Sequence, residues 1–308
     1  MRIARFAVND EVKFGIVDGG IVDGGIVDGG IVDGGIVNGG TVHGDIGRPD
    51  VGSPGENGTA DAIGREPDEL RVAEIVGHPF GPSAGEAKLT GVTYSLADVR
   101  LLAPVLPSKV VAIGKNYLEH ARETGSEPPA EPLIFLKPST AVVGPGDAIV
   151  RPVEQSERVD YEGELAIVFG RLCRDVPAAR VPEVIFGYTC ANDVTARDLQ
   201  AKDGQWTRAK GFDTFCPLGP WIETALDPGD VRLTTTVNGE VKQDSRTSLL
   251  IHDITTLVTY VTSVMTMLPG DVLLTGTPGG IGPVVAGDSV SVSVEGIGAL
   301  TNRVVDGG

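Results

Sequence analysis

The sequence is poor in cysteine, aromatic residues, basic residues and long apolar runs. Three cysteines in 308 residues, with no CxxC pair and no neighbouring histidine cluster, argue against a disulfide framework and favour a reducing, cytosolic setting. We expect Cys173, Cys190 and Cys216 to be small buried residues. No apolar run has the length of a membrane span or a signal peptide, so we expect a cytoplasmic protein with no membrane partner.

The shortage of basic residues bears on possible partners. Lysine and arginine number 25 against 42 aspartates and glutamates, which gives a net charge of -17. Such a chain repels polyanions and carries no basic stripe with interleaved aromatics, so nucleic acid is not expected as a partner. Neither GxGxxG after a strand nor a GK[ST] loop occurs, which disfavours nucleotide cofactors. An acidic protein that binds an anionic substrate needs a metal ion or a few local cations.

A short repeat stands near the N-terminus. Residues 15–39 are five copies of Gly-Ile-Val-Asp-Gly, the last with Asn38 in place of aspartate. Ile-Val pairs favour strands and Asp-Gly pairs favour tight turns, so we expect at least one β-hairpin, with weakly specified register because the period is odd. Calcium binding is the alternative interpretation, but calcium-binding β-helices repeat every nine residues.

The remaining pattern predicts an α+β chain that is mostly β. Residues 41–64, rich in Gly, Pro and Asp, are expected to form a mobile loop, and a boundary near residue 104 separates a small β-rich N-terminal domain (1–104) from a catalytic domain (105–308). Short apolar runs predict strands at 110–113, 133–136, 165–169, 184–188, 231–237, 272–274 and 290–294. Helices are predicted at 117–123, 178–181, 196–202 and 254–267.

Two glutamates and an aspartate are candidate metal ligands. Glu162 and Glu164 precede the run 165–169, and residues two apart on a strand share a face, so their carboxylates lie side by side. Like charges so placed repel unless a cation lies between them, and oxygen ligands suit magnesium, manganese or calcium. Asp193 follows the apolar stretch 184–191 and is the natural third ligand. The alternative interpretations are a solvated strand end for the glutamates and a turn or helix cap for Asp193.

Three further segments carry candidate site residues. On the predicted helix 117–123, His120 and Glu123 lie three apart, where a carboxylate can orient an imidazole; a solvated pair is the alternative. Lys210, in a glycine-interrupted segment beside aromatics, could hold a carboxylate or enolate oxygen. The turn Thr275–Gly280 has hydroxyls that could bind an anionic group.

Taken in chain order, these motifs resemble those of the fumarylacetoacetate hydrolase superfamily. The resemblance covers the chain from about residue 105 to the C-terminus. The motifs are Ile113-Gly114-Lys115-Asn116-Tyr117 with His120 and Glu123, Phe135-Leu136-Lys137-Pro138, Asp160-Tyr161-Glu162-Gly163-Glu164, Asn192-Asp193, Lys210-Gly211-Phe212-Asp213 and Thr275-Gly276-Thr277-Pro278.

The resemblance implies a mixed β-sheet roll, a homodimer and a magnesium or manganese ion on Glu162, Glu164 and Asp193, with calcium able to substitute in vitro. It implies a catalytic dyad of His120 and Glu123 on a lid that orders around substrate, with Lys210 also catalytic. The substrate-binding positions are Asn116, Tyr117, Lys210 and Thr277. The family pattern lacks the fivefold repeat, which makes the first hundred residues hard to place.

The expected substrate is a small 2-oxo or 2,4-dioxo acid. The ion would chelate its carboxylate and 2-oxo oxygens and stabilise an enolate, while His120 and Glu123 activate a water molecule and Lys210 steadies the developing oxygen charge. This predicts hydrolysis of the carbon–carbon bond of an acylpyruvate such as fumarylpyruvate. The same enolate would allow isomerisation of a 2-hydroxyhepta-2,4-diene-1,7-dioate, or decarboxylation of oxaloacetate or a 5-carboxymethyl-2-oxo-hex-3-ene-dioate. A non-enzymatic role, calcium binding or protein interaction through the repeat, is the rival class.

Overall fold

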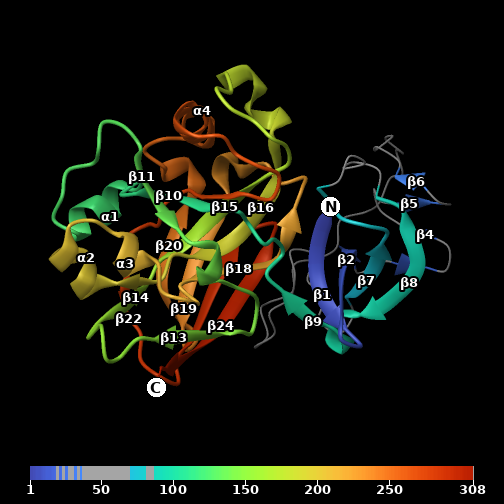
Figure 1. Cartoon of the computed structure of the whole chain (residues 1–308), viewed down its shortest axis with the longest axis horizontal. Coiled ribbons are helices and arrows are strands. Elements are labelled where there is room, and N and C mark those ends of the chain that lie inside the picture. Colours follow the sequence, from blue (N-terminus) through green and yellow to red (C-terminus); the bar gives the residue numbers. More distant parts are fainter. Residues whose placement is uncertain are drawn as a thin grey trace, which may run out of the picture.

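The structure, a computed structural model, describes residues 1–18, 70–80 and 87–307 and four two-residue strands at 21–22, 25–26, 31–32 and 35–36. It is built mostly of strands with a few short helices (Figure 1), which confirms the prediction of a mostly β, α+β chain. The expected mobile loop, 41–64, lies outside the described residues.

A twelve-stranded sheet runs through the molecule. Its order is β11 (Leu133–Lys137), β10 (Val110–Gly114), β21 (Val272–Leu274), β15 (Gly163–Phe169), β16 (Ile185–Asn192), β18 (Cys216–Glu223), β1 (Arg2–Val8), β2 (Glu11–Asp18), β7 (Arg71–Ile75) and β8 (Leu89–Ser95). β12 (Val142–Val143) pairs with β18, and β9 (Arg100–Leu102) pairs with β1. The predicted strands at 110–113, 133–136, 165–169 and 272–274 all belong to this sheet.

Three smaller sheets complete the β structure. The five-stranded one contains β13 (Ala148–Arg151), β24 (Gly298–Asp306), β23 (Ser289–Val294), β19 (Arg232–Val237) and β20 (Glu240–Arg246). The three-stranded one contains β17 (Thr195–Ala196), β14 (Val159–Tyr161) and β22 (Gly282–Pro283). In the four-stranded one, β3 (Ile21–Val22), β4 (Gly25–Ile26), β5 (Ile31–Val32) and β6 (Gly35–Ile36) pair antiparallel in sequence, which confirms the hairpin expected in the repeat.

The helices are short. They are α1 (Leu118–Glu123), α2 (Arg197–Asp203), α3 (Thr207–Lys210) and α4 (Ile254–Val264), with 3-10 turns at Leu96–Asp98, Ser139–Ala141, Ala178–Glu183, Pro228–Asp230 and Thr247–Leu249. Figure 1 shows α1, α2 and α3 gathered at one side of the main body. Among the described residues, no helix has the length and apolarity needed to cross a membrane.

Two helix predictions and one loop prediction need correction. The segment predicted as a helix at 178–181 is a 3-10 turn, because Pro182 lies inside it and cannot donate a helical hydrogen bond. α4 ends three residues before the predicted end, because Met265 has an extended backbone. Lys210, expected in a loop, is the last residue of α3.

The apolar runs of the large sheet are continuous because both of its faces are buried. In β15, Leu165, Ile167 and Phe169 belong to one core cluster, while Ala166 and Val168 belong to another. The first cluster also takes in the inward side chains of α4 and the five-stranded sheet. Cys173, Cys190 and Cys216 are unpaired and buried, as expected.

The N-terminal strands continue the sheet of the main body. Arg2 and Ile3 of β1 pair antiparallel with Glu223 and Ile222 of β18, so β1, β2, β7 and β8 extend one edge of the sheet as a lobe (Figure 1). A domain boundary at residue 104 stays a prediction.

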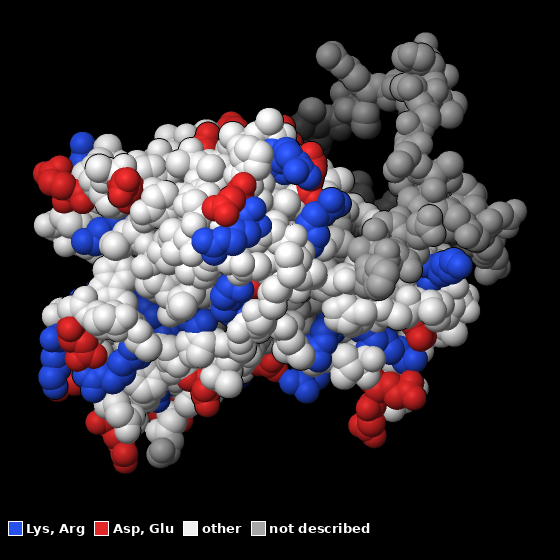
Figure 2. Space-filling model, turned by 45° about the horizontal axis from the view of Figure 1, so that its top comes forward, with Lys and Arg blue, Asp and Glu red and all other residues white. Residues whose placement is uncertain are grey.

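On the face drawn in Figure 2, basic and acidic side chains of the described residues are interspersed.

Candidate metal and substrate site

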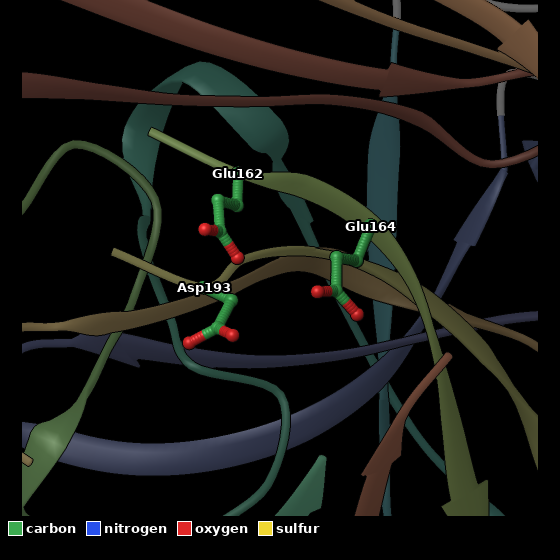
Figure 3. Close-up of side chains that lie close together, drawn as sticks. All are labelled: Glu162, Glu164 and Asp193. Atoms are coloured by element: carbon green, nitrogen blue, oxygen red, sulfur yellow. The ribbon is translucent and has the colours of Figure 1, made fainter. Parts of the chain in front are cut away.

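Three buried carboxylates meet beside β15. Glu162 lies between β14 and β15, Glu164 is the second residue of β15, and Asp193 directly follows β16. None is more than 3% exposed, and one oxygen from each lies within 4.8 Å of the others. Figure 3 shows the three carboxylates gathered around a common space. The residues expected as metal ligands are therefore brought together by the fold.

Strand pairing explains this convergence. β15 and β16 run antiparallel with Glu164 opposite Ala191, and the Asp193 backbone N–H donates to the Glu162 carbonyl at 2.8 Å. The Asn192 side chain accepts a hydrogen bond from the Glu162 N–H at 2.9 Å. The end of β16 is thus held against the start of β15, and Asp193 is delivered beside the two glutamates.

Three basic side chains neutralise two of these carboxylates. Lys210 Nζ lies 2.8 Å from Glu162 Oε2 and 2.6 Å from Asp193 Oδ2, and Lys137 Nζ lies 2.6 Å from Asp193 Oδ1. Arg197 donates to Glu162 Oε1. Burial by itself would raise the pKa of Glu162, but the charges of Lys210 and Arg197 outweigh burial and hold that pKa well below its usual range.

Glu164 is the exception, because no basic side chain among the described residues forms an ion pair with it. Its Oε2 accepts a hydrogen bond from the Gly276 N–H at 2.6 Å. Burial, with the charges of Asp193 and Glu162, raises its pKa well above the ordinary value. A buried carboxylate that faces two others and lacks its own cation fits a hard divalent ion with oxygen ligands, such as Mg²⁺ or Mn²⁺. Glu162, Glu164 and Asp193 can hold such an ion.

His120 and Glu123 lie together on α1. His120 is 5% exposed, and its Nδ1 is 3.8 Å from Glu123 Oε2 and has no hydrogen-bond partner in the part of the chain that the structure describes. That separation is too long for a hydrogen bond. The Glu123 carboxylate instead accepts from the Gly280 N–H at 3.1 Å. Burial lowers the pKa of His120, so the imidazole is neutral at neutral pH and able to accept a proton.

Both α1 residues line one pocket with the carboxylates. This pocket has a volume of about 420 Å³, and its wall includes His120, Glu123, Glu162, Glu164, Asp193, Lys210 and Thr277. Apolar and aromatic side chains, Ile113, Phe135 and Trp206, form another part of it. The volume suits a small organic acid.

Two predicted substrate-binding residues lie outside this lining. The Asn116 amide donates to the carbonyls of His252 and Thr275 at 3.0 and 2.8 Å and accepts from the His252 N–H at 2.8 Å. Tyr117 is 3% exposed, with a pKa raised first by burial and then by the charge of Glu164. The bonds of Asn116 hold the segment before α1 in place, and direct contact of either residue with substrate stays a prediction.

Thr277 does line the pocket, and it belongs to a buried network. Its hydroxyl donates to the Gly163 carbonyl at 2.9 Å and accepts from Gln243 Nε2 at 2.8 Å. Gln243 Oε1 in turn accepts from the Gly163 N–H at 2.9 Å. The residue between the two glutamates is therefore tied to the turn that carries Thr277.

Sequence reasoning assigned no role to several residues of this site: Lys137, Asp160, Arg197, Gln200, Trp206 and Gln243. For Lys137 a signal existed, because a lysine at the end of an apolar strand needs a partner if it is buried. Arg197 offered a weaker signal as a cation four residues after Asp193. For Gln243 the local sequence contained none, because its partners are 34 and 80 residues away.

A carboxylate triad that can hold a divalent ion, a neutral histidine and a buried lysine line one pocket, an arrangement that suits metal-assisted enzyme chemistry. Comparison with known proteins identifies the family to which the chain belongs. The model described as fumarylacetoacetate (FAA) hydrolase C-terminal matches residues 109–305, and one described as Rv2993c-like, N-terminal matches residues 58–104. The chain belongs to the fumarylacetoacetate hydrolase family, as the motifs predicted.

Relatives extend this placement. The chain is 58% identical over 243 residues to Protein Rv2993c of Mycobacterium tuberculosis, covering 78% of this chain and 90% of that protein. It is 42% identical to the oxaloacetate tautomerase Fahd2a of Rattus norvegicus, a mitochondrial protein, over 68% of this chain and 70% of that one. The structure of a 5-carboxymethyl-2-hydroxymuconate delta-isomerase from Mycobacterium smegmatis superposes with a TM-score of 0.78 at 50% identity, covering 100% of both chains.

Proposed function

We propose that this enzyme transfers a proton on a small 2-oxo dicarboxylic acid, interconverting its keto and enol forms or moving a conjugated double bond. The observation that carries the proposal is His120, a neutral and nearly buried base in the same pocket as the carboxylate triad and Lys210. Similarity to an oxaloacetate tautomerase and a muconate isomerase supports proton transfer as the first choice over hydrolysis.

Each pocket residue has its own role in the proposed reaction. A divalent ion held by Glu162, Glu164 and Asp193 would supply Lewis-acid polarisation of the 2-oxo group. His120 accepts the proton from the carbon beside that group, and Glu123, 3.8 Å away, stabilises the imidazolium that forms. Lys210 places its charge where oxygen becomes negative. Return of the proton to a different atom of the substrate completes the reaction.

Hydrolysis of an acylpyruvate is the second candidate, and the His120–Glu123 pair favours it. Two acid–base groups three residues apart on one face of α1 can share a water molecule, whose oxygen would add to the acyl carbonyl. The carbon–carbon bond would then break, releasing a carboxylic acid and the enolate of pyruvate, which takes up a proton.

Three unpaired, buried cysteines support a reducing compartment, and we propose the cytosol.

A substrate panel tests these proposals. Oxaloacetate, a 2-hydroxyhepta-2,4-dienedioate, acetylpyruvate and fumarylpyruvate are incubated with the protein in Mg²⁺, Mn²⁺ or EDTA, while enol absorbance is followed and products are identified. We expect metal-dependent tautomerisation or isomerisation of the dicarboxylates. Release of pyruvate from acylpyruvates alone would favour hydrolysis, and release of carbon dioxide would favour decarboxylation.

Variants separate the site from background chemistry. Glu164→Gln and His120→Gln should each lower kcat by about 100-fold or more, since they remove a metal ligand and the base. Glu154→Gln, at an exposed glutamate, is the matched control and should retain full activity. Activity that survived both EDTA and Glu164→Gln would contradict the proposed metal site.

A further inference from the structure

The basic side chains that line the pocket are not equivalent. They are Lys115, Arg158, Arg197 and Lys210. Arg158 and Arg197 bind the Asp160 carboxylate at 2.8 and 2.9 Å, and Lys210 binds Glu162 and Asp193. Lys115 has no acidic partner within the part of the chain that the structure describes. Its charge is therefore available to an anion that enters the pocket.

The backbone at Lys115 is held in an unusual conformation. Lys115 has φ of 59°, in the left-handed region that lysine rarely adopts, and it directly follows β10. Asn116, clamped by its bonds to His252 and Thr275, holds one side, while the Trp206 ring fills the space beside Gly114 on the other. A strained backbone that persists in a pocket wall points to a functional position for the side chain.

Charge balance indicates what this cation can bind. Five carboxylates line the pocket or pair with its cations: Asp160, Glu123, Glu162, Glu164 and Asp193. Five cations line the pocket or pair with these carboxylates: Lys115, Lys137, Arg158, Arg197 and Lys210. With every carboxylate ionised the group is neutral, and a divalent ion would leave it with two positive charges. A dianionic substrate restores neutrality, whereas a monoanion does not.

We propose that Lys115 binds the distal carboxylate of the substrate and so selects dicarboxylic over monocarboxylic 2-oxo acids. This inference rests on the proposed function, because the proximal carboxylate and 2-oxo group are taken to lie at the triad. Lys115 is a specificity-determining residue: it sets which acid is bound, and the proton transfer belongs to His120.

Paired substrates test this role. Oxaloacetate and its 4-ethyl ester share one carbon skeleton, and only the first has a distal charge. With Mg²⁺ present, Lys115→Met should lower kcat/KM for oxaloacetate by about 10- to 100-fold, mainly through KM, and change that for the ester less than about threefold. Lys115→Arg should retain most of the preference. Lys202→Met, at an exposed lysine outside the lining, makes the same change in net charge and should behave like the unmodified protein.

A binding measurement separates failure of this inference from failure of the proposed function. By calorimetry with Mg²⁺, malate should bind more tightly than lactate, and Lys115→Met should reduce that ratio by about tenfold. If none of the acids is turned over yet the malate preference depends on Lys115, the proposed reaction is wrong and the role of Lys115 stands. Equal loss for oxaloacetate and its ester, or an unchanged malate-to-lactate ratio, would overturn the inference. Lys115→Gly, which relieves the positive φ, should keep the melting temperature and lose the same preference, so misfolding cannot mimic the result.

Discussion

Glu164 is the residue at which burial and charge conflict most directly. Its folded pKa lies above the ordinary value of 4.5, because burial and the charges of Asp193 and Glu162 disfavour its ionised form. The folded protein therefore retains a proton that the unfolded chain releases near pH 4.5. The stability that this proton contributes is fully present below pH 4.5 and is lost as pH rises through the raised pKa.

The loss of this stability with rising pH should be measurable in the melting temperature. In EDTA, the melting temperature of the unmodified protein should fall relative to that of Glu164→Gln as pH rises from about 5 to 8, because glutamine does not ionise and the other titrating groups are common to both proteins. Added Mg²⁺ should raise the melting temperature more at pH 8 than at pH 5, since the ion binds the ionised carboxylate. Scanning calorimetry of both proteins checks this. A Mg²⁺ effect of equal size in Glu164→Gln would mean that the ion binds elsewhere.

At the scale of elements, Gly163 allows two sheets to approach each other at the site. A Cβ placed on Gly163 would lie 2.0 Å from Thr235 Oγ1 of β19, and 3.2 Å from Val292 of β23. The segment that carries both glutamates therefore lies directly against the five-stranded sheet. Gln243 of β20 ties the same residue to Thr277. The position of the metal ligands thus depends on close contact between two sheets.

Gly163→Ala should consequently lower the free energy of unfolding by about 1–3 kcal/mol and weaken Mg²⁺ binding, because the backbone between the ligands must shift. Adding Thr235→Ala should restore part of both losses by removing the hydroxyl. Gly229→Ala, in an exposed turn where the nearest atom to a new Cβ is 3.3 Å away, is the control. Urea denaturation and Mg²⁺ titration measure the effects, and additive losses in the double variant would contradict the contact argument.

At the scale of the whole molecule, no described residue of the repeat lines the pocket. The first repeat unit begins within β2, and β3 to β6 pair only with one another in the described structure. Deletion of residues 20–34, which removes three five-residue units and leaves β2 intact, should keep kcat/KM within about twofold, because the pocket loses no lining residue. Steady-state kinetics of the two proteins check this.

Calcium titration of the same pair tests the rival class. Saturable calcium binding lost on deletion, or a tenfold loss of activity, would mean that the repeat has a function of its own. The homodimer implied by family resemblance stays a prediction, as does the division of the chain at residue 104.

The local sequence pattern determined how the metal ligands and the His120–Glu123 pair are placed, but not which residues surround them. Glu162 and Glu164 share a face because strand residues alternate, and Asp193 ends a buried run, so their convergence required only that β15 and β16 pair. His120 and Glu123 are neighbours through helical spacing. These relations hold within a few residues, and the strands at 110–113, 133–136, 165–169 and 272–274 were predictable for the same reason.

Tertiary structure decided what surrounds those groups. Lys137 reaches Asp193 across 56 residues and Arg197 reaches Glu162 across 35, so no local period could reveal these pairs. The Asn116 amide donates to backbone carbonyls 136 and 159 residues away, which its local sequence does not reveal, and its contact with substrate stays a prediction. The N-terminal strands join the main sheet because β1 pairs with β18. Sequence periodicity determines which face a side chain occupies, whereas the order in which distant strands pair determines which side chains that face meets.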